Sequence, residues 1–505
     1  MPLQSEELGK HKLSLYQSNL NFCTEAESFD EAQRVDLFVT RQWIRILLWE
    51  YTIRRFSMSC RLEDQAFSLL LPITIAHEML SLFHAVSESS IQLHGYGMVQ
   101  PVTPGSGHAE LDIDQARSLG IEAFALNVGQ PDADWARSTI GQLFAHASRS
   151  DFKLFFSLDF YQNGDINAYN GILTDFLGHP AYLRAGPYNH PVVSTFSVGQ
   201  YGPEQFRDWK VNSWGNSIYF IPNADRSVGY NNPPSWFEAW NQAVEGVFGW
   251  ESAWPESGTS PANVSDAVDI AVQNAAHRNG KTYMAPLSSL QYKDCCGANY
   301  YRIGEANLPE KMMQLLNLNP DFVEILTWND AGESHYIGNN WPEGLTPEML
   351  AYSNNEEWSH RAWQPLIASW IAAYKSNKDS GGMTPPAGSQ AIGAMWYRTI
   401  PTNAPCAGGR KPDNWQSALD AVNYAVVVAP DSAGIVIRVI SAGQVISEKR
   451  AAAGLNYGSV PGMRLGSQRI ELVNGDSVVQ VAAGSKDVVA DDSACNFNYQ
   501  VVELK

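Results

Sequence analysis

The chain has 505 residues, a net charge of -19 at neutral pH and a sequence pI near 5.0. A protein this acidic repels nucleic-acid phosphates and anionic membranes, so neither is expected as a partner. Hydrophobic residues make up 44% and charged residues 17% of a chain that is too long for one typical core, which predicts a folded protein of two or more domains.

Residues 1–93 form an atypical N-terminal extension. Segment 35–56 has the spacing of an amphipathic helix, and residues 67–76 (FSLLLPITIA) form an apolar run. The run is too short to span a bilayer, so no stable membrane insertion is expected, but it has the length of the apolar core of a signal peptide. Two interpretations stay open. Either translation begins near Met58 and the run directs secretion, or the run is a buried helix of the extension.

Between residues 94 and 376, short apolar runs alternate with helical patterns. The predicted strands cover 96–100, 121–127, 153–159, 192–196, 217–221, 246–250, 282–286 and 322–328. Helices are predicted over 109–119, 133–149, 166–178, 203–210, 234–243, 263–279 and 309–317, with a last one over 359–375. Eight strands, each followed by a helix, predict an α/β fold with a parallel (β/α)8 barrel.

Active sites of such barrels lie at the carboxyl ends of the strands. Asn127 ends the second predicted strand, Asp159 ends the third, Trp250 ends the sixth, and Asn329 with Asp330 follows the eighth. Strands often end in polar turns, but an acid placed directly after four buried residues must be paired or must face the mouth. These positions predict a polar site at one end of the barrel.

The segment TWNDAGESH (327–335) holds two carboxylates, Asp330 and Glu333, three residues apart. Glycoside hydrolysis needs such a pair, because one carboxyl protonates the leaving oxygen while the other activates water or attacks the sugar. Trp328 beside them offers a flat apolar face and an N–H donor. Taken alone, two acids after a strand are more often turn or capping residues. Their place in a predicted barrel favours catalysis.

Residues 377–390 have the composition of a linker, and residues 391–505 are rich in strand patterns. The predicted strands cover 394–399, 424–429, 435–440, 468–472, 478–482 and 498–502, with a short helix over 415–422. They predict a β-sandwich that serves carbohydrate contact or structural support. Support is favoured because no row of aromatic residues stands out.

The cysteines show no CxxC pair or Cys/His spacing that suggests zinc, and no metal or organic cofactor is expected. Cys406 and Cys495 bracket the last domain, and we predict a disulfide between them, which would stabilise by roughly 4–5 kcal/mol in the chain-entropy model. Cys295 and Cys296 are adjacent, and they could be free, joined to each other or paired elsewhere.

Several segments from residue 94 onward resemble glycoside hydrolase family 71, the fungal α-1,3-glucanases or mutanases. The matching segments are GIEAFALNVG, FKLFFSLDFY, PVVSTF, GWESAWP, YMAPLS, PDFVEILTWNDAGESHYI, ALDAVNYAVVV, GLNYGSVPGM and CNFNYQVV. The resemblance covers about four fifths of the chain. It implies a (β/α)8 barrel with a C-terminal β-sandwich, endo-hydrolysis of α-1,3-glucan with net inversion, and an extracellular or cell-wall location.

Carried over residue by residue, the resemblance implies that Asp330, Glu333 and Asp159 are the catalytic acids. It suggests Glu333 as general acid, Asp330 as general base, and Asp159 as the group that holds substrate or water. The residues that it implies along the sugar subsites are Asn127, Trp250, Trp254, Trp328, Asn329, His335 and Tyr336. For each Trp the alternative is core packing, and for His335 it is a hydrogen bond to the backbone.

The first strand departs from the family pattern, since HGYGM (94–98) stands where members have a sequence like FAHYM. A defective first strand would weaken the barrel. Two other functions therefore stay open: a catalytically silent protein that binds α-glucan, and hydrolysis of another glucan by the same carboxylates. A polysaccharide is the expected partner in each case, and a monomer is the expected assembly.

Overall fold

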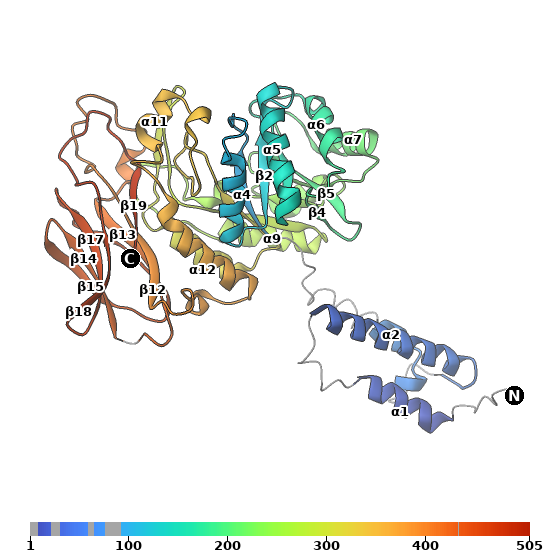
Figure 1. Ribbon diagram of the computed structural model, residues 1–505. Coiled ribbons are helices and arrows are strands. Elements are labelled where there is room, and N and C mark those ends of the chain that lie inside the picture. Colours follow the sequence, from blue (N-terminus) through green and yellow to red (C-terminus); the bar gives the residue numbers. More distant parts are fainter. Residues whose placement is uncertain (1–8, 22–30, 59–64, 76–91, 433) are drawn as a thin grey trace. The chain divides into compact units, whose positions relative to one another are not determined.

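The computed structural model describes residues 9–21, 31–58, 65–75, 92–432 and 434–505. Contacts divide the chain into two compact units, Met1–Ser90 and Ile91–Lys505. Figure 1 shows the helices and strands of each unit.

The first unit is helical. It contains α1 (Lys10–Asn21), α2 (Glu31–Ile53) and the short 3-10 helix η2 (Gln65–Phe67). Gln17 of α1 donates from Nε2 to the backbone carbonyl of Arg45 of α2 over 2.8 Å, which ties the two helices together. Among the described residues, none of the helices has both the length and the apolar content that crossing a bilayer requires.

Part of the apolar run 67–76 is helical. Residues 71–75 form a helical turn, and Phe67, Leu71 and Ile75 are buried within this unit. Ala76 lies outside the described residues. The run therefore contributes to the small core of the first unit.

The second unit is built on a curled parallel sheet, with helices along its outer face (Figure 1). Its parallel strands are β1 (Leu93–Met98), β2 (Ala123–Val128), β3 (Lys153–Asp159), β5 (His190–Phe196), β6 (Tyr219–Pro222), β7 (Gly246–Phe248), β8 (Thr282–Ser288) and β11 (Phe322–Leu326). Each of the eight predicted strands overlaps one of them. The short strand β4 (Arg184–Ala185) pairs antiparallel with β5 at the margin.

The strand order brings distant segments together. The first strand, β1, pairs in parallel with both β2 and β11, so the HGYGM segment takes its place in the sheet. A parallel bridge between Asn223 and Phe248 connects the segment after β6 to β7. The sheet therefore curls until strands from its two ends approach each other.

Helices follow most of these strands and cover the outer face. They are α4 (His108–Ser118), α5 (Asp134–Ser150), α6 (Asn170–Phe176), α7 (Pro203–Trp214), α8 (Pro233–Trp240), α9 (Ala267–Arg278), α10 (Asn307–Leu318), α11 (Pro347–Ser353) and α12 (Gln364–Lys375). Several end at a residue in the left-handed conformation, such as Asp151 after α5 and Asn319 after α10. Asn and Asp tolerate this conformation better than most residues, which suits them to stopping a helix.

Side chains alternate between the two faces of the sheet. Phe124 of β2 packs against Phe152 and Trp328 on the helix-covered side, with ring centroids 5.0 and 5.2 Å apart. Phe155 of β3 packs against His94 of β1 on the inner side, with centroids 5.0 Å apart. Asp159 lies four residues after Phe155 on the same strand, so its side chain belongs to the inner side.

The C-terminal part forms two four-stranded antiparallel sheets. One contains β12 (Ala391–Arg398), β13 (Ala421–Val428), β16 (Gly454–Pro461) and β19 (Tyr499–Glu503). The other contains β14 (Ile435–Ser441), β15 (Gln444–Arg450), β17 (Gln468–Asn474) and β18 (Ser477–Ala483). Inward side chains of both sheets, including Tyr424, Ile437 and Leu472, share one hydrophobic cluster.

This C-terminal part is joined to the parallel sheet by buried polar contacts. Trp396 donates from Nε1 to the backbone carbonyl of Glu305 over 2.9 Å, and the hydroxyls of Tyr301 and Tyr499 lie 2.8 Å apart. Cys406 and Cys495 form a disulfide bond. The two hydrogen bonds hold β12 and β19 of the first sheet against the segment that follows β8, whereas the disulfide closes a loop within the C-terminal part.

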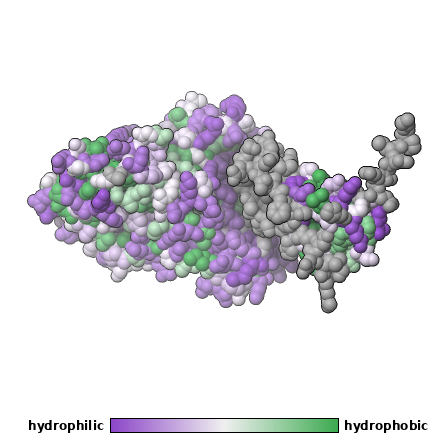
Figure 2. Space-filling model, turned by 90° about the horizontal axis from the view of Figure 1, so that it is seen from below, coloured by the Kyte–Doolittle hydropathy of each residue, from purple (hydrophilic) through white to green (hydrophobic). Residues whose placement is uncertain are grey.

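The surface of the C-terminal sheets carries few large apolar groups. On the face of the second unit seen in Figure 2, hydrophilic residues predominate and hydrophobic ones are scattered. The exposed large hydrophobic residues described beyond residue 400 are aliphatic: Leu419, Val445, Leu465, Val478, Val479 and Val489. Sugar rings stack on aromatic faces, and none of these exposed residues offers one.

Several elements differ from the sequence-based expectation. Residues 415–422 were expected to be helical, but only the 3-10 turn η8 (Trp415–Ser417) forms before β13 begins at Ala421. The expected linker 377–390 contains the 3-10 turn η7 (Ser380–Gly382), which contacts β16. Strands β15 and β16 were not predicted.

The hairpin of β9 (Gln291–Cys295) and β10 (Ala298–Arg302) was also not predicted. It inserts between β8 and α10 in the chain. Its charged and polar residues lack a simple alternation of apolar and polar positions, which is the signal that sequence patterns provide for a strand.

Candidate active site

The turn after β11 is held in shape by its own hydrogen bonds. Thr327 accepts from the backbone N–H of Asp330 at its hydroxyl over 2.9 Å. Asp330 accepts from the backbone N–H of Glu333 at Oδ1 over 3.0 Å. The backbone N–H of Thr327 donates to the carbonyl of His335 over 2.7 Å. These bonds present Asp330, Glu333 and His335 from one short, closed turn.

Glu333 lies in a ring of polar partners. Its Oε2 accepts from Nε2 of Gln291 over 2.7 Å and lies 3.1 Å from Nε2 of His335. Its Oε1 lies 3.5 Å from Nζ of Lys293. Burial by itself raises the pKa of Glu333, but hydrogen bonding and charge from His335, followed by Lys293 and Gln291, outweigh burial and lower it to about 2. Glu333 is therefore ionised at any ordinary pH.

Asp330 has the opposite electrostatic character. Burial raises its pKa, the charge of Glu333 adds to the rise, and His335 and Lys293 oppose it only in part. Its Oδ2 lies 3.8 Å from Nε2 of His335. The side chains of Asp330 and Glu333 remain 16% and 23% exposed, so both can meet a substrate. Two neighbouring carboxyls with opposite pKa shifts are suited to an acid and a base.

Asp159 occupies the inner side of the sheet at the end of β3. Its Oδ1 accepts from the backbone N–H groups of Tyr161 and Gln162, each over 3.0 Å. Burial raises its pKa, although these hydrogen bonds oppose the rise. The charges of both Asp159 and Asp330 add to the raised pKa of buried Tyr96, so Tyr96 of β1 lies within electrostatic reach of both acids.

Two of the predicted tryptophans lie beside this group. The ring of Trp250 lies 4.8 Å from Tyr96 and 6.2 Å from His335, and the ring of Trp254 lies 5.3 Å from His335 (centroid distances). Asp225 accepts from the backbone N–H of Trp250 over 2.5 Å and so fixes the start of the loop that follows β7. Trp250 and Trp254 are thus packed around the carboxylate turn, with 6% and 3% of their surface exposed.

Asn127 lies at the inner edge next to β3. In register it faces Ser157, two residues before Asp159. The amide Nδ2 of Asn127 is buried and has no hydrogen-bond partner among the described residues. This donor is available for a substrate hydroxyl or a water molecule.

Three other predicted residues have different places. Trp328 is 2% exposed and packs on Phe124 on the helix side of the sheet. Tyr336 is fully buried and stacks on His360 with centroids 4.1 Å apart. The amide of Asn329 is occupied by the backbone of Met98, accepting from its N–H over 2.8 Å and donating to its carbonyl over 3.0 Å. The structure does not bring these side chains to the carboxylates.

The hairpin of β9 and β10 supplies site residues that sequence reasoning missed. Gln291 and Lys293 alternate on β9 and both reach Glu333. Tyr300 of β10 also lies against Glu333, whose charge adds to burial in raising the pKa of Tyr300. Arg302 donates to Glu251 over 2.8 Å and lies 5.2 Å above the ring of Trp254. No alternating pattern in the hairpin sequence could have indicated these residues.

The same turn contains the donor atoms that could hold a metal ion among the described residues. One atom each from Asp330, Glu333 and His335 lies within 4.8 Å of the others. Carboxylate and imidazole donors suit several divalent transition metals. The positively charged Lys293 ammonium lies beside Glu333, and its charge opposes the binding of a metal cation by these three groups.

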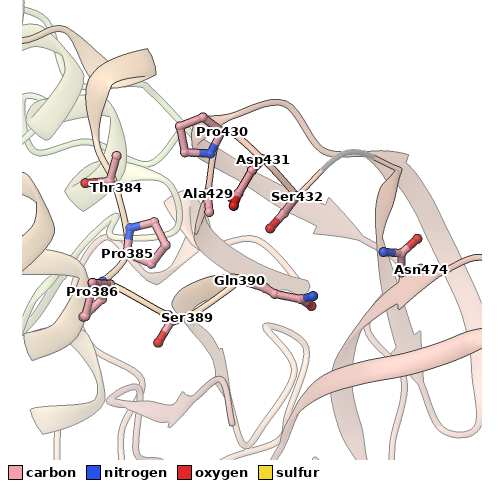
Figure 3. A pocket seen from close by; sticks show the side chains of 12 residues that line it. Thr384, Pro385, Pro386, Ser389, Gln390, Ala429, Pro430, Asp431, Ser432 and Asn474 are labelled. Atoms are coloured by element: carbon pink, nitrogen blue, oxygen red, sulfur yellow. The ribbon is translucent and has the colours of Figure 1, made fainter.

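A hollow of about 400 Å³ lies elsewhere, between residues 384–390, residues 429–432 and Asn474 (Figure 3). Its walls carry prolines and short polar side chains, and Asp431 is its one ionisable group. It contains neither a carboxylate pair nor an aromatic face for a sugar ring. This hollow is therefore a weaker candidate for sugar hydrolysis than the turn after β11.

The site combines two carboxylates with opposite pKa shifts and two flanking tryptophans at the carboxyl end of a parallel sheet. These features are typical of the active site of a glycoside hydrolase. The model of the family described as glycosyl hydrolase family 71 matches residues 97–505. The chain belongs to this family.

Three fungal relatives are similar over most of the chain. A mutanase of Penicillium rubens is 28% identical over 402 residues, which cover 77% of this chain and 83% of that protein. A glucan endo-1,3-alpha-glucosidase of Schizosaccharomyces pombe is 32% identical over 347 residues, covering 67% and 74%. The ascus wall endo-1,3-alpha-glucanase of the same yeast is 28% identical over 422 residues, covering 77% and 90%.

Proposed function

We propose that this protein is an endo-acting hydrolase of α-1,3-glucan that uses a carboxylate acid and base. The observation that carries the proposal is the pair Asp330 and Glu333, whose pKa values are moved in opposite directions on one turn. Membership of family 71 and the names of the relatives indicate the substrate. A polysaccharide is the partner, and the chain acts as a monomer.

From the sequence, Glu333 was expected to be the general acid and Asp330 the general base. The electrostatics favour the opposite assignment. Glu333 is ionised and partnered by His335, Lys293 and Gln291, so we assign it as the general base that activates water. Burial raises the pKa of Asp330, which favours the protonated form, and we assign it as the general acid that protonates the leaving glucan oxygen. Asp159 and Asn127 position the sugar or the water from the inner side of the sheet.

Inversion at the anomeric carbon is the outcome that the family resemblance implies, and we propose it. Inverting pairs usually keep their carboxyl groups about 6.5–9.5 Å apart to leave room for water. Here the nearest oxygens of Asp330 and Glu333 lie within 4.8 Å. Inversion therefore requires the two carboxyl groups to move apart when substrate enters. Proton NMR of the fresh product tests this proposal. If the β-anomer appears first, inversion is supported; if the α-anomer appears first, the enzyme retains the configuration.

We also propose the finer architecture and the location. Eight parallel strands with their helices form a (β/α)8 barrel, supported by the bridge between Asn223 and Phe248. The two C-terminal sheets form a β-sandwich, supported by their shared hydrophobic cluster. The protein works outside the cell or in the cell wall, supported by the Cys406–Cys495 disulfide, since disulfides persist in oxidising compartments.

The decisive experiment measures reducing ends released by the full chain from insoluble α-1,3-glucan, with α-1,4-glucan and β-1,3-glucan in parallel. Release of oligosaccharides from α-1,3-glucan alone is expected. Release from another glucan instead would overturn the substrate assignment. Binding to α-1,3-glucan in a pull-down without any release would show a silent binding protein.

A further inference from the structure

The hairpin beside the site carries two adjacent thiols. Cys295 ends β9 and is buried, whereas Cys296 is exposed. Their Sγ atoms lie 3.1 Å apart. Cys296 and Gly297 form the two-residue turn, with φ of 58° and 80°. Such turns favour Asn, Asp or Gly at the first position, and a cysteine in the left-handed conformation is uncommon. Turn formation does not account for Cys296.

One of these thiols, that of Cys295, touches the turn that holds the two carboxylates. The Sγ of Cys295 lies 4.0 Å from the carbonyl oxygen of Gly332, which stands between Asp330 and Glu333 in the chain. Tyr352 donates from its hydroxyl to the same carbonyl over 2.8 Å. Lys293, two residues before Cys295 on β9, is the cation beside Glu333. A movement of Cys295 can therefore reach the carboxylates in two ways, through its contact with Gly332 and through Lys293 on the same strand.

We propose that Cys295 and Cys296 are a dithiol modification site that small-molecule disulfides oxidise to a vicinal disulfide, and that closing this ring lowers the hydrolytic rate. The effect on rate rests on the proposed function, whereas the thiol chemistry does not. Exposure gives Cys296 access to an external disulfide, while Cys295 lies in the protein interior beside it.

The reaction is two successive thiol–disulfide exchanges. The Cys296 thiol loses its proton and attacks one sulfur of glutathione disulfide, and the first glutathione thiolate leaves and takes up that proton. The Cys295 thiol then loses its proton and attacks the Cys296 sulfur, and the second glutathione leaves as its thiol. The protein gives up two hydrogen atoms, and one glutathione disulfide becomes two thiols. Burial raises the pKa of Cys295 to about 12, which makes it a poor nucleophile toward an external disulfide. Cys295 therefore reacts only in the second, intramolecular step, for which its Sγ lies 3.1 Å from that of Cys296.

The ring is expected to be reversible. Neighbouring Cα atoms are about 3.8 Å apart, shorter than the roughly 4.4–6.8 Å of ordinary disulfides, so a vicinal disulfide is strained and easily reduced. Closing it moves the sulfurs from 3.1 Å to a bond of about 2.05 Å. This movement displaces Cys295 from Gly332 and shifts the strand that carries Lys293.

The test uses the full chain with Cys23→Ser and Cys60→Ser, because those two cysteines lie outside the described residues and would confuse a thiol count. The protein is treated with glutathione disulfide. Free thiols are counted after denaturation, the intact mass is measured, and the rate on α-1,3-glucan is recorded before and after, then again after mild dithiothreitol. Cys296→Ser in the same background is the matched control, and its exposed side chain lies outside the site.

Oxidation should remove both free thiols, lower the mass by two hydrogen atoms without an adduct, and reduce the rate several-fold until dithiothreitol restores it. The Cys296→Ser control should keep its rate. Two remaining thiols, or a lasting glutathione adduct, would overturn the modification site. Ring closure with an unchanged rate would overturn its coupling to the carboxylates. A reduced protein that cleaves no glucan would refute the proposed function while leaving the thiol count valid.

Discussion

Gln291 donates from Nε2 to Oε2 of Glu333 over 2.7 Å, although 42 residues separate them in the chain. The bond joins the β9–β10 hairpin to the turn after β11. Gln291 in turn accepts at Oε1 from Nη1 of Arg302 over 3.4 Å. The ionised state of the proposed base is thus set first by His335 of its own turn and then by Lys293 and Gln291 of a hairpin that is not part of the parallel sheet.

Replacing the proposed base should stop hydrolysis without unfolding the protein. Glu333→Gln keeps the shape of the side chain but cannot accept a proton from water, and a general base contributes about 10²–10⁴-fold to a rate. A loss of that size in reducing-end release is expected, with an unchanged circular dichroism spectrum. Glu356→Gln, at an exposed position, should act like the parent. A Glu333→Gln rate within tenfold of the parent would remove Glu333 from the mechanism.

The acid can be told from the base by the leaving group. Asp330→Asn should lose most activity on glucan, where the departing oxygen needs a proton. It should lose far less on a dinitrophenyl α-1,3-oligoglucoside, because dinitrophenolate departs without protonation. Glu333→Gln should be equally impaired on both substrates. Equal impairment of Asp330→Asn on both would reverse the two roles.

The pH dependence should respond to Lys293. Glu333 acts when ionised, above its pKa of about 2, and Asp330 acts when protonated, below its raised pKa, so activity falls as pH rises through the pKa of Asp330. Lys293 lowers both pKa values. Lys293→Met should therefore move both limbs of the pH profile of kcat/KM to higher pH. Lys449→Met, an exposed surface change, should leave the profile in place, and an unmoved profile in Lys293→Met would contradict the assignment.

Asn329 should matter for stability more than for sugar binding. Asn329→Ala leaves the N–H and carbonyl of Met98 without their partner, and unpaired, partly buried backbone groups cost about 1–3 kcal/mol. Urea unfolding should show that loss with little change in KM. Asn329→Asp keeps the acceptor and should lose less. A raised KM with unchanged stability would instead make Asn329 a substrate contact.

The disulfide of the C-terminal part should stabilise the fold. Cys406 and Cys495 are 89 residues apart, and closing a loop of that length contributes about 4–5 kcal/mol in the chain-entropy model. The double variant Cys406→Ala with Cys495→Ala should lose about that much in free energy of unfolding, measured under non-reducing conditions. Cys296→Ala, which breaks no disulfide of the structure, serves as the control. A loss below about 1 kcal/mol would show that other contacts hold these segments together.

The sequence by itself determined the local elements and the carboxylate turn. Strand β3 and strand β11 follow from buried apolar runs, because the alternation of side chains along a strand is a property of the local chain. Asp159, Asp330 and Glu333 follow directly after those runs, so their place at the strand ends needed no tertiary information. The turn motif was specific enough to indicate the family.

Only the tertiary structure decided which side chains surround the carboxylates and with what charge. Gln291 and Lys293 reach Glu333 because a hairpin folds across the sheet, and contacts at that separation leave no local periodicity in the sequence. The same holds for Trp328 and Tyr336, which adjoin the carboxylates in the chain but pack into the interior. A pKa depends on burial and on neighbouring charges in space, so the opposite shifts of Asp330 and Glu333 emerge only when the fold has brought these groups together.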